Sequence, residues 1–561
     1  MLQPLKPGPF LVLFLLFQVS LIRFGLANLC QEEAFDQRRP NRILFLSHWE
    51  RMNPGVRLNV DDADKVLIIG GGPGGIAAAR ALSDAEVPFL GIERAQNLGG
   101  VWTQLGRGAP GFDGLTTISS KRFTRFKDWS YKDAAEAWEW GTGRSFGKIK
   151  RGYLTAEQVG IYLQTYARHF GVQDHYKFET EIEELQVVDV RLSDHFTGDP
   201  RDLHEPYRIL ARFKNSRQVR LFRFAILSSG FQRIPFLPDE QVSEIRSTLG
   251  IPVYHSMDLG SAEDFKSFRD KRVVIVGGGQ TALDFANRIA LEGGHPVLSL
   301  RRGYHYIPRY VGFQTADDFA ELSSLLQIPV WLRRVAFAPL VRMIVGDLSK
   351  YGFPKPDHAL LDTQPTLVPD GFLERVKNGM IEVQGGILQI GQAGLRSLTL
   401  ESHLDPKGKI TVRNPDAVIY ATGFRHDRVP YIDSTNQTSG FPSKSDGTLD
   451  LNEMHVAFTD PRVPALVMGR FETDGSAFPI LEAQAGLIET VLRDPQRNLA
   501  ILDGHIRVGR FNLQGGLYRL RSNRSEIGVD HTRYRRTLLR LADYLKADAM
   551  MDALIRSESG E

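Results

Sequence analysis

The chain has 561 residues, of which 42% are hydrophobic and 24% charged, so it can form the cores of two or three domains and is not expected to be disordered. Its 69 basic and 66 acidic residues nearly balance, which gives no reason to expect a nucleic-acid partner. The single cysteine, Cys30, excludes an internal disulfide, a CxxC redox centre and a cysteine-rich zinc site, and we expect no metal site.

Residues 1–27 have the features of a secretory signal peptide. Lys6 provides a positive start, residues 10–22 are mostly apolar, and small residues lead up to Ala27, after which we expect cleavage. The apolar stretch is shorter than the ~20 residues of a membrane span, so an uncleaved anchor and an organelle-targeting segment rank below a signal. We therefore expect entry into the secretory pathway, to the endoplasmic reticulum lumen or the exterior, with no transmembrane span after signal removal. Two glycosylation sequons fit this expectation: Asn436-Gln437-Thr438 and Asn523-Arg524-Ser525.

The α/β pattern begins at Asp64, after a polar leader (28–63) that we expect to pack on the surface. Short apolar runs at 65–69 and 88–93 predict strands, and the small-residue stretch 75–84 between them predicts a helix.

Further along, residues 131–152 are expected to form an inserted surface loop with some helix. Apolar residues at helical spacing predict a helix over 155–170, and the run 224–230 predicts a strand. The proline-marked stretch 234–241 that follows is a natural domain boundary.

A second α/β unit opens at Arg272 and includes a strand at 297–300. A long mixed segment, 303–410, separates it from a third buried strand at 417–424. The chain then runs through an apolar stretch at 465–471 to a predicted helix near 479–493.

This order predicts an α/β fold of two nested, doubly wound Rossmann-type domains, the outer one interrupted by the inner one, with a mostly helical C-terminal tail. The expected boundaries in chain order are 1–27 for the signal peptide, 28–63 for the leader, 64–234 for the first part of the outer domain, 235–425 for the inner domain, 426–499 for the second part of the outer domain and 500–561 for the tail.

The first glycine cluster matches G-x-G-x-x-G at Gly70, Gly72 and Gly75, after an apolar strand and before a small-residue helix. The first glycine permits a tight turn, the second lets the backbone approach a pyrophosphate, and the third lets the helix pack closely on the strand. The second strand ends in Glu93, placed to accept hydrogen bonds from ribose hydroxyls. The cluster therefore predicts a dinucleotide site; an ordinary glycine turn is the lesser alternative.

The second cluster consists of Gly277, Gly279 and Ala282, the permitted G/A variant, and its second strand ends in Arg301 and Arg302 instead of an acid. Guanidinium groups bind a 2′-phosphate through charge-assisted hydrogen bonds, so this unit should prefer NADP over NAD. The alternative is a solvated basic strand end. Two dinucleotide sites in one chain imply electron transfer, and the economical pair is NADPH as donor and FAD as acceptor.

The two clusters belong to a series of sequence landmarks in a fixed order. These are GGGPGG at 70–75, GIERAQNLGGVW at 91–102, TTISSKRFTRFKDW at 116–129, GGGQTALD at 277–284, LRRGYHYIPR at 300–309, YATGFRHD at 420–427 and GSAFPILEAQ at 475–484. With these landmarks, the chain resembles the flavin-containing monooxygenases over about residues 64–495. This single-component class of flavoprotein monooxygenases uses FAD and NADPH. A more distant likeness is to a FAD-dependent oxidoreductase of the endoplasmic reticulum lumen.

The resemblance implies that NADPH reduces FAD, that a C4a-hydroperoxyflavin forms with O₂, and that a soft nucleophile (N or S) of a small molecule is oxygenated. The implied FAD contacts are Gly70, Gly71, Gly72, Pro73, Gly74, Gly75, Glu93, Gly100, Val101, Trp102 and Ser119. The implied NADP contacts are Gly277, Gly279, Gln280, Thr281, Ala282, Arg301 and Arg302.

Two departures from the family pattern bear on function. The family asparagine beside the flavin aligns with Ile118, which donates no hydrogen bond; Ile118, Ser119 and Lys121 are the flavin-side candidates, and no catalytic residue is assigned. The family identifier is degraded around His255, which is either a functional group at the domain junction or a structural linker residue.

Three alternatives stay open beside oxygenation. An NADPH oxidase or reductase of the secretory pathway would release peroxide because Ile118 does not stabilise the hydroperoxide. A lumenal binding protein would keep FAD for stability alone, although an intact second cluster argues against it. A Baeyer–Villiger oxygenase shares the architecture but has a differently patterned identifier.

Overall fold

The structure is a computed structural model that describes residues 42–149, 152–195, 205–216, 218–318, 330–358, 360, 366–392, 395–405, 407–425, 429–433, 439–441, 462–473, 476–507, 528–529 and 531–559. The predicted signal peptide, Cys30 and both glycosylation sequons lie outside the described residues. Among those residues, no helix is both long and apolar enough to span a bilayer.

The outer domain is built on a five-stranded parallel sheet whose short strands are buried on both faces. In spatial order these strands are β22 (Ala465–Val467), β9 (Phe224–Leu227), β3 (Val66–Ile69), β4 (Phe89–Ile92) and β5 (Tyr176–Lys177). Along β3, Val66 and Ile68 point into a core shared with helices, whereas Leu67 and Ile69 point into a core shared with a second sheet.

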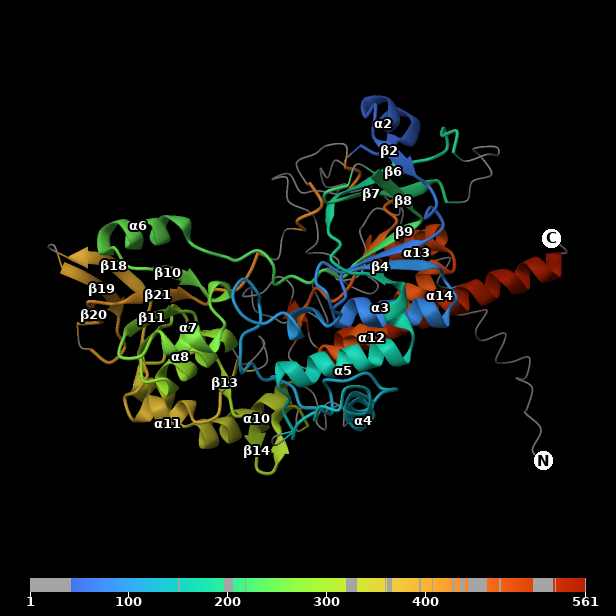
Figure 1. Cartoon of the computed structure of the whole chain (residues 1–561). Helices are drawn as coiled ribbons and strands as arrows, with labels where there is room; N and C mark the ends of the chain where they lie inside the picture. The colour runs from blue at the N-terminus through green and yellow to red at the C-terminus, as the bar shows by residue number, and fades with distance from the viewer. Residues whose placement is uncertain are drawn as a thin grey trace, which may run out of the picture.

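Helices cover one face of this sheet (Figure 1). They are α3 (Pro73–Asp84), α5 (Ala156–His169), α12 (Phe478–Leu492) and α14 (His531–Ser559). The helix α5 begins with a capping box, in which Thr155 and Gln158 bond each other's backbone amides, so the predicted helix start near Thr155 has a local cause.

The other face is covered by a five-stranded sheet that contains the described part of the leader. Its spatial order is β1 (Leu44–Phe45), β6 (Ile182–Asp189), β7 (Tyr207–Phe213), β8 (Gln218–Phe222) and β2 (Arg57–Asn59). The helix α2 (Leu46–Met52) follows β1 and buries Leu46 and Trp49. The expectation of a leader packed on the surface is therefore wrong for residues 42–63, which supply two edge strands and a buried anchor.

The inner domain is inserted between β9 and β22 and has its own five-stranded parallel sheet. The spatial order is β10 (Val253–His255), β21 (Ala417–Tyr420), β11 (Arg272–Val276), β12 (His295–Ser299) and β17 (Glu382–Gln384). One face packs against α7 (Ala262–Lys266), α8 (Gln280–Leu291) and α11 (Phe372–Lys377). The other packs against α6 (Asp239–Leu249) and an antiparallel sheet of β18 (Ile387–Gln392), β19 (Leu395–Glu401) and β20 (Lys409–Arg413).

The predicted α/β class with two nested Rossmann-type units is thus confirmed, and Figure 1 shows the two domains side by side, the inner one carrying α6 and α8. The connection after β12 carries the short strands β13 (Tyr306–Ile307) and β16 (Thr366–Leu367), the hairpin of β14 (Tyr310–Val311) and β15 (Gln314–Thr315), and α10 (Val330–Val345).

The segment expected to form a surface loop and the tail expected to be helical both contain helices packed on the core. The segment 131–152 contains α4 (Tyr131–Thr142), which begins with a capping box between Ser130 and Asp133 and buries Tyr131. In the tail, α13 (Pro495–Arg507) precedes α14, and α14 packs against α12. Tyr534 of α14 is fully buried in this contact, and its hydroxyl accepts a hydrogen bond from the side-chain amide of Gln484 on α12 at 3.1 Å. The tail therefore completes the core of the outer domain.

Candidate functional site

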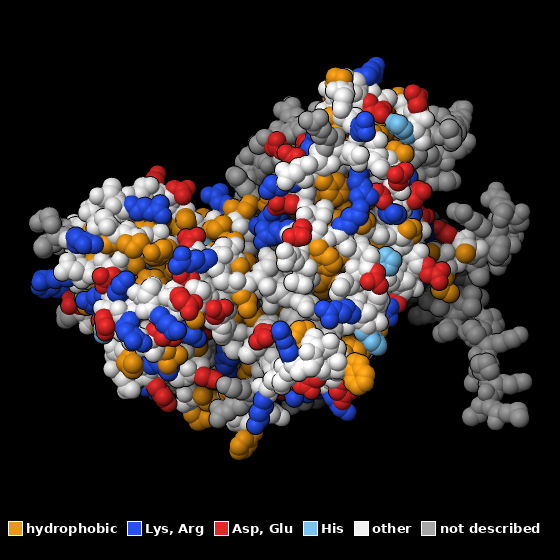
Figure 2. Space-filling view, viewed as in Figure 1, with side chains coloured by type: hydrophobic (Ala, Val, Ile, Leu, Met, Phe, Trp, Pro, Cys, Tyr) orange, Lys and Arg blue, Asp and Glu red, His pale blue; other side chains and the backbone are white. Residues whose placement is uncertain are grey.

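Both glycine clusters line one cleft of about 1260 Å³ between the domains. From the outer domain come Gly70, Gly72 and the start of α3, and from the inner domain come Gly277, Gly279 and the start of α8. Figure 2 shows apolar and basic side chains together on the face where the two domains meet. The sequence predicted two sites; the structure makes them neighbours in a single space.

The first glycine loop is shaped by contacts that leave no room for side chains. Gly70 has φ +108°, and a Cβ there would lie 2.6 Å from the carbonyl oxygen of Ser228. A Cβ on Gly75 would collide with the carbonyl oxygen of Gly70. The helix α3 then starts at Gly72 with no side-chain cap, so its first amides are free to bind an anion.

Glu93 joins the end of β4 to this loop. Its Oε2 accepts from the Gly71 amide at 2.6 Å and its Oε1 from the Ala95 amide at 2.9 Å. The carboxylate is buried and lines the cleft. Since each carboxylate oxygen has a second lone pair, Glu93 can still accept from ribose hydroxyls.

The segment after β4 lies directly against the first loop. The Gly99 amide donates to the Gly71 carbonyl at 2.8 Å, and a Cβ on Gly100 would lie 2.9 Å from the Cα of Gly72. Gly100, Val101 and Trp102 form a short 3-10 helix that lines the cleft. Of the other predicted FAD contacts, Pro73, Gly74 and Ser119 also line the cleft, whereas Gly71 and Gly75 act behind its surface.

The second glycine loop repeats this geometry but leaves more open space at the N-terminus of α8. Gly277 has φ +137°, and a Cβ there would collide with the carbonyl oxygen of Ala421. Gly279 caps α8 with no side-chain hydrogen bond, and a Cβ on it would have no heavy atom within 4 Å, which leaves space for a phosphate. Gln280 and Thr281 line the cleft, but Ala282 is fully buried in the inner-domain core and does not.

Arg301 and Arg302 are exposed at the end of β12 and line the same cleft. Within the part of the chain that the structure describes, neither guanidinium is engaged in an ion pair or side-chain hydrogen bond. Both side chains are therefore available to a phosphate, as the NADP prediction requires.

The three flavin-side candidates do not share one location. Ile118 and Ser119 line the cleft, and the Ser119 hydroxyl lies 2.7 Å from the Thr124 hydroxyl. Lys121 is exposed and does not line the cleft, and its amide donates to the Gly152 carbonyl at 2.7 Å. The structure therefore does not place Lys121 beside the predicted flavin.

His255 lies at the end of β10 and contacts the segment after β21 that returns to the outer domain. Its Nδ1 accepts from the Met257 amide at 3.1 Å, so Nε2 carries the proton and donates to the Gly423 carbonyl at 3.0 Å. Burial lowers its pKa, and the side chain does not line the cleft. These contacts fit the structural-linker alternative.

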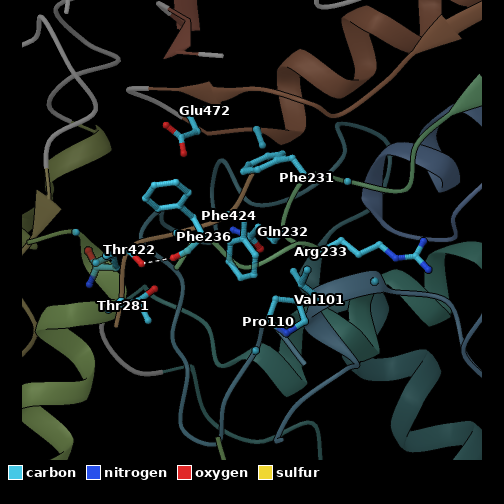
Figure 3. Close-up of a pocket in the computed structure, with 18 of the residues that line it drawn as sticks. Val101, Pro110, Phe231, Gln232, Arg233, Phe236, Thr281, Thr422, Phe424 and Glu472 are labelled. Atoms are coloured by element: carbon cyan, nitrogen blue, oxygen red, sulfur yellow. Dashed lines mark hydrogen bonds between the residues drawn. The ribbon is translucent and has the colours of Figure 1, made fainter. Parts of the chain in front are cut away.

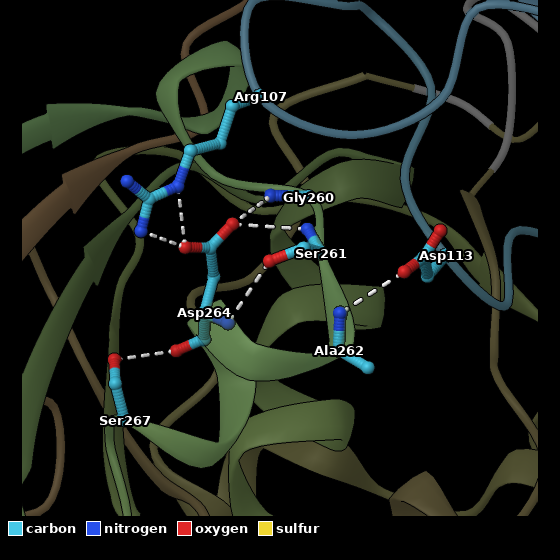
Figure 4. Close-up of polar contacts among 7 residues, drawn as sticks. All are labelled: Arg107, Asp113, Gly260, Ser261, Ala262, Asp264 and Ser267. Carbon is cyan, nitrogen blue, oxygen red and sulfur yellow. Dashed lines mark hydrogen bonds and ion pairs between the residues drawn. The ribbon is translucent and has the colours of Figure 1, made fainter.

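A second contact between the domains fixes the loop that follows Trp102. Figure 4 shows Arg107 of the outer domain paired with Asp264 of α7, and the Ala262 amide donating to Asp113 at 3.0 Å. Burial raises the pKa of Asp264, but hydrogen bonds from Arg107 and from the amides of Gly260 and Ser261 lower it well below the ordinary value. The sequence carried no signal for this contact, since its partners lie far apart in the chain.

Asp284, which lines the cleft, and Arg309, which interacts with it electrostatically, are further residues that sequence reasoning did not single out. Burial raises the pKa of Asp284, which lines the cleft, to about 6, although Arg309 and a hydrogen bond from Gln280 lower it. Arg309 is buried over the ring of Tyr153 and donates to the Thr116 hydroxyl at 2.9 Å. Arg309 lies in the LRRGYHYIPR landmark, but only the fold shows that it reaches the outer domain.

Three phenylalanines and Glu472 also line the cleft. Figure 3 shows Phe231, Phe236 and Phe424 grouped in the cleft, with Glu472 beyond them. The Thr422 hydroxyl donates to the Phe236 carbonyl, which ties the two domain-crossing segments together. Across the described ranges, no group of three or more His, Cys, Asp or Glu side chains could hold a metal ion.

Comparison with known proteins finds relatives over most of the chain. A model of the family described as Flavin-binding monooxygenase-like matches residues 63–499. The chain is 23% identical over 383 residues to the probable indole-3-pyruvate monooxygenase YUCCA9 of Arabidopsis thaliana, covering 67% of this chain and 79% of that protein. It is 23% identical over 381 residues to flavin-containing monooxygenase 5 of Homo sapiens, covering 66% of this chain and 63% of that protein.

Solved structures share the fold at low identity. The open crystal structure of cyclohexanone monooxygenase matches with a TM-score of 0.55 and 15% identity over 87% of this chain and 98% of that chain. The crystal structure of OTEMO in complex with FAD and NADP matches with a TM-score of 0.51 and 15% identity over 78% of this chain and 85% of that chain.

Proposed function

Because the chain belongs to the family of flavin-binding monooxygenase-like proteins, we propose that it oxygenates a soft nucleophile, nitrogen or sulfur, of a small molecule with O₂ and NADPH. When bound, FAD would supply the redox chemistry that the proposal needs, which is acceptance of a hydride and activation of O₂. The observation that carries the proposal is the single cleft lined by both glycine loops. A hydride can pass between two dinucleotides only if their reactive rings share one space.

The outer-domain residues fit FAD. The uncapped start of α3 offers amides to the pyrophosphate, and Gly72 has no side chain to block its approach. Glu93 has free lone pairs for the ribose, and its two amide contacts hold it in place. The segment Gly100–Trp102 also lines the cleft on this side.

The inner-domain residues fit a 2′-phosphorylated nucleotide. The first amides of α8, like those of α3, have no side-chain cap, and Gly279 leaves the space in front of them unobstructed. Arg301 and Arg302 supply two forked donors at the end of the adjacent strand, where an acid would repel the extra phosphate. The crystal structure of OTEMO in complex with FAD and NADP has the same fold and supports this pairing.

The chain's contribution to the oxygenation step is to exclude water and position the substrate. Phe231, Phe236 and Phe424 give the cleft an apolar surface, and Ile118 is a further apolar lining residue where the family has an asparagine. A dry site slows side reactions of a reactive oxygen species. Compared with the family asparagine, Ile118 removes a hydrogen-bond donor from the cleft lining.

That loss favours a second candidate function, an NADPH oxidase or reductase that releases peroxide. The two functions differ in how much substrate is oxygenated for each NADPH consumed. We expect dimethylaniline or thioanisole to be oxygenated with most of the NADPH coupled to product. Peroxide equal to the NADPH consumed, with no product from these probes or from cyclohexanone as a ketone probe, would establish the oxidase instead.

The secretory location is part of the proposal and rests on residues 1–27 and the two sequons. Expression of the full chain in animal cells tests it. Loss of residues 1–27 and a mobility shift on glycosidase treatment are expected. An unglycosylated chain that keeps its N-terminus would contradict it.

A further inference from the structure

Glu472 is placed on the cleft by a short strand of the outer domain. It opens β23 (Glu472–Thr473), which pairs with β24 (Gly528–Val529) and leads to α12. Its neighbours Phe471 and Thr473 are buried, whereas Glu472 is half-buried and lines the cleft. Its carboxylate is therefore partly withdrawn from water and accessible to a molecule in the cleft.

The carboxylate of Glu472 has no hydrogen-bond or ion-pair partner among the described residues. The two other glutamates on the outer-domain side of the cleft are both engaged. Glu93 accepts from two backbone amides, and Glu181 pairs with Arg233 and Lys214. A half-buried carboxylate without a partner pays a desolvation cost that a bound cation would offset.

The surroundings of Glu472 favour an organic cation. In the view of Figure 3, Phe231, Phe236 and Phe424 lie between Glu472 and the side of the cleft that carries Val101. Phe236 is 47% exposed, so apolar ring surface faces the cleft. Aromatic faces attract ammonium groups, and a nearby carboxylate adds charge complementarity.

We propose that Glu472 is a specificity-determining residue that binds a cationic ammonium group of the substrate, at a position separate from the atom that is oxygenated. The assignment rests on the proposed function, because it names the substrate class of the same cleft. It favours thioethers and amines that carry an additional ammonium group over their neutral or anionic analogues. Glu472 takes part in no bond-making step; it holds the substrate while the soft nucleophile faces the flavin.

A matched pair of thioethers tests the assignment. One probe is 2-(methylthio)ethyl-trimethylammonium, whose charge does not depend on pH, and the other is its neutral carbon isostere, 3,3-dimethylbutyl methyl sulfide. With saturating NADPH, the wild-type protein should show a kcat/KM about tenfold higher for the cation, as expected for a partly desolvated ammonium beside a carboxylate and aromatic rings. E472Q should remove this preference while leaving kcat/KM for the neutral probe within about twofold.

The variant E401Q is the matched control, because Glu401 also lines the cleft but lies on β19 of the inner domain. It should keep the preference for the cation. Equal kcat/KM for both probes in the wild-type protein, or the same loss of preference in E401Q, would overturn the assignment. An equal fall for both probes in E472Q, with an altered flavin absorption spectrum, would also overturn it by placing Glu472 on the flavin.

Calorimetry of probe binding to the oxidised, FAD-containing protein separates this proposal from the proposed function. Suppose that neither probe is oxygenated, that the wild-type protein binds the cation about tenfold more tightly than the isostere, and that E472Q binds both equally. The assignment of Glu472 then stands and the proposed oxygenation fails. If both probes are oxygenated but bind equally, oxygenation stands and the assignment fails.

Discussion

The Gly71 amide donates to the Oε2 of Glu93 at 2.6 Å, which joins the first glycine loop to the residue that ends the second strand of the outer domain. The two residues belong to one motif in the sequence, but the bond shows that the acid also holds the loop in place. Because the Ala95 amide occupies the other oxygen, rotation of the carboxylate would break two contacts at once. Glu93 therefore presents fixed lone pairs to the cleft.

The variant E93Q tests this double role. A glutamine keeps one acceptor oxygen, but its NH₂ group would face a backbone N–H of Gly71 or Ala95, and it loses the charge-assisted bond to the ribose. We expect FAD to bind about 10- to 100-fold more weakly, from the loss of a charged hydrogen bond. Fluorescence titration of the cofactor-free protein with FAD measures this. E136Q, on the exposed side of α4, is the control, and an unchanged affinity in E93Q would remove Glu93 from the site.

Replacing Arg301 and Arg302 together by alanine should reverse the nucleotide preference. We expect KM for NADPH to rise about 10- to 100-fold, since each guanidinium loses a charged contact with the 2′-phosphate, while KM for NADH changes less than about twofold. Steady-state oxidation of both nucleotides measures the ratio. R269A alters an exposed arginine of the same domain and should leave the ratio unchanged; equal effects of the double variant on both nucleotides would refute the phosphate role.

Ile118→Asn restores the donor that the family has in this loop. Because Ile118 lines the cleft, the new amide should stabilise the oxygenated state by about one hydrogen bond and slow its decay about fivefold. Peroxide released per NADPH should fall accordingly. Ile118→Leu keeps an apolar lining residue and should behave like the wild-type protein. The same peroxide yield in all three proteins would mean that this position does not act on the oxygen chemistry.

Asp284 gives the fold a specific pH dependence. Burial raises its pKa to about 6, whereas an unfolded aspartate titrates near ~4, so the folded state binds more protons between these values. The free energy of unfolding should therefore fall as pH rises from about 4 to about 6, by about 1–2 kcal/mol, and stay lower above it. D284N removes this contribution. Urea unfolding at several pH values should show a shallower dependence for D284N than for wild type or the exposed-site control E244Q, and parallel curves would contradict the assignment.

The local sequence pattern was sufficient to predict the elements whose structure depends on residues close together in the chain. The sequence of β3, Gly70–Gly75 and α3 combines a buried apolar run, glycines at turns and a small-residue helix, and each has a backbone or packing cause in the structure. The same holds for α5, whose capping box lies within four consecutive residues. The nested order of the two units also follows from the order of these signals along the chain.

Features that depend on distant segments were not predictable in the same way. The strands β1 and β2 are only two and three residues long, so their place at the edges of a sheet comes from pairing with β6 and β8. The tail was predicted as helical, but its role in the core depends on the packing of α14 against α12. Phe236 and Glu472 carry no motif, and the YATGFRHD landmark that contains Phe424 does not reveal its neighbours. The three residues line one cleft only because the domains close around it.

Anaerobic stopped-flow absorption of the purified, FAD-loaded protein mixed with NADPH tests the central claim most directly. The shared cleft predicts rapid bleaching of the oxidised flavin, much faster with NADPH than with NADH, followed by oxygenated product when O₂ and a thioether are added. A flavin that stays oxidised in excess NADPH would show that the two nucleotides do not meet in this cleft.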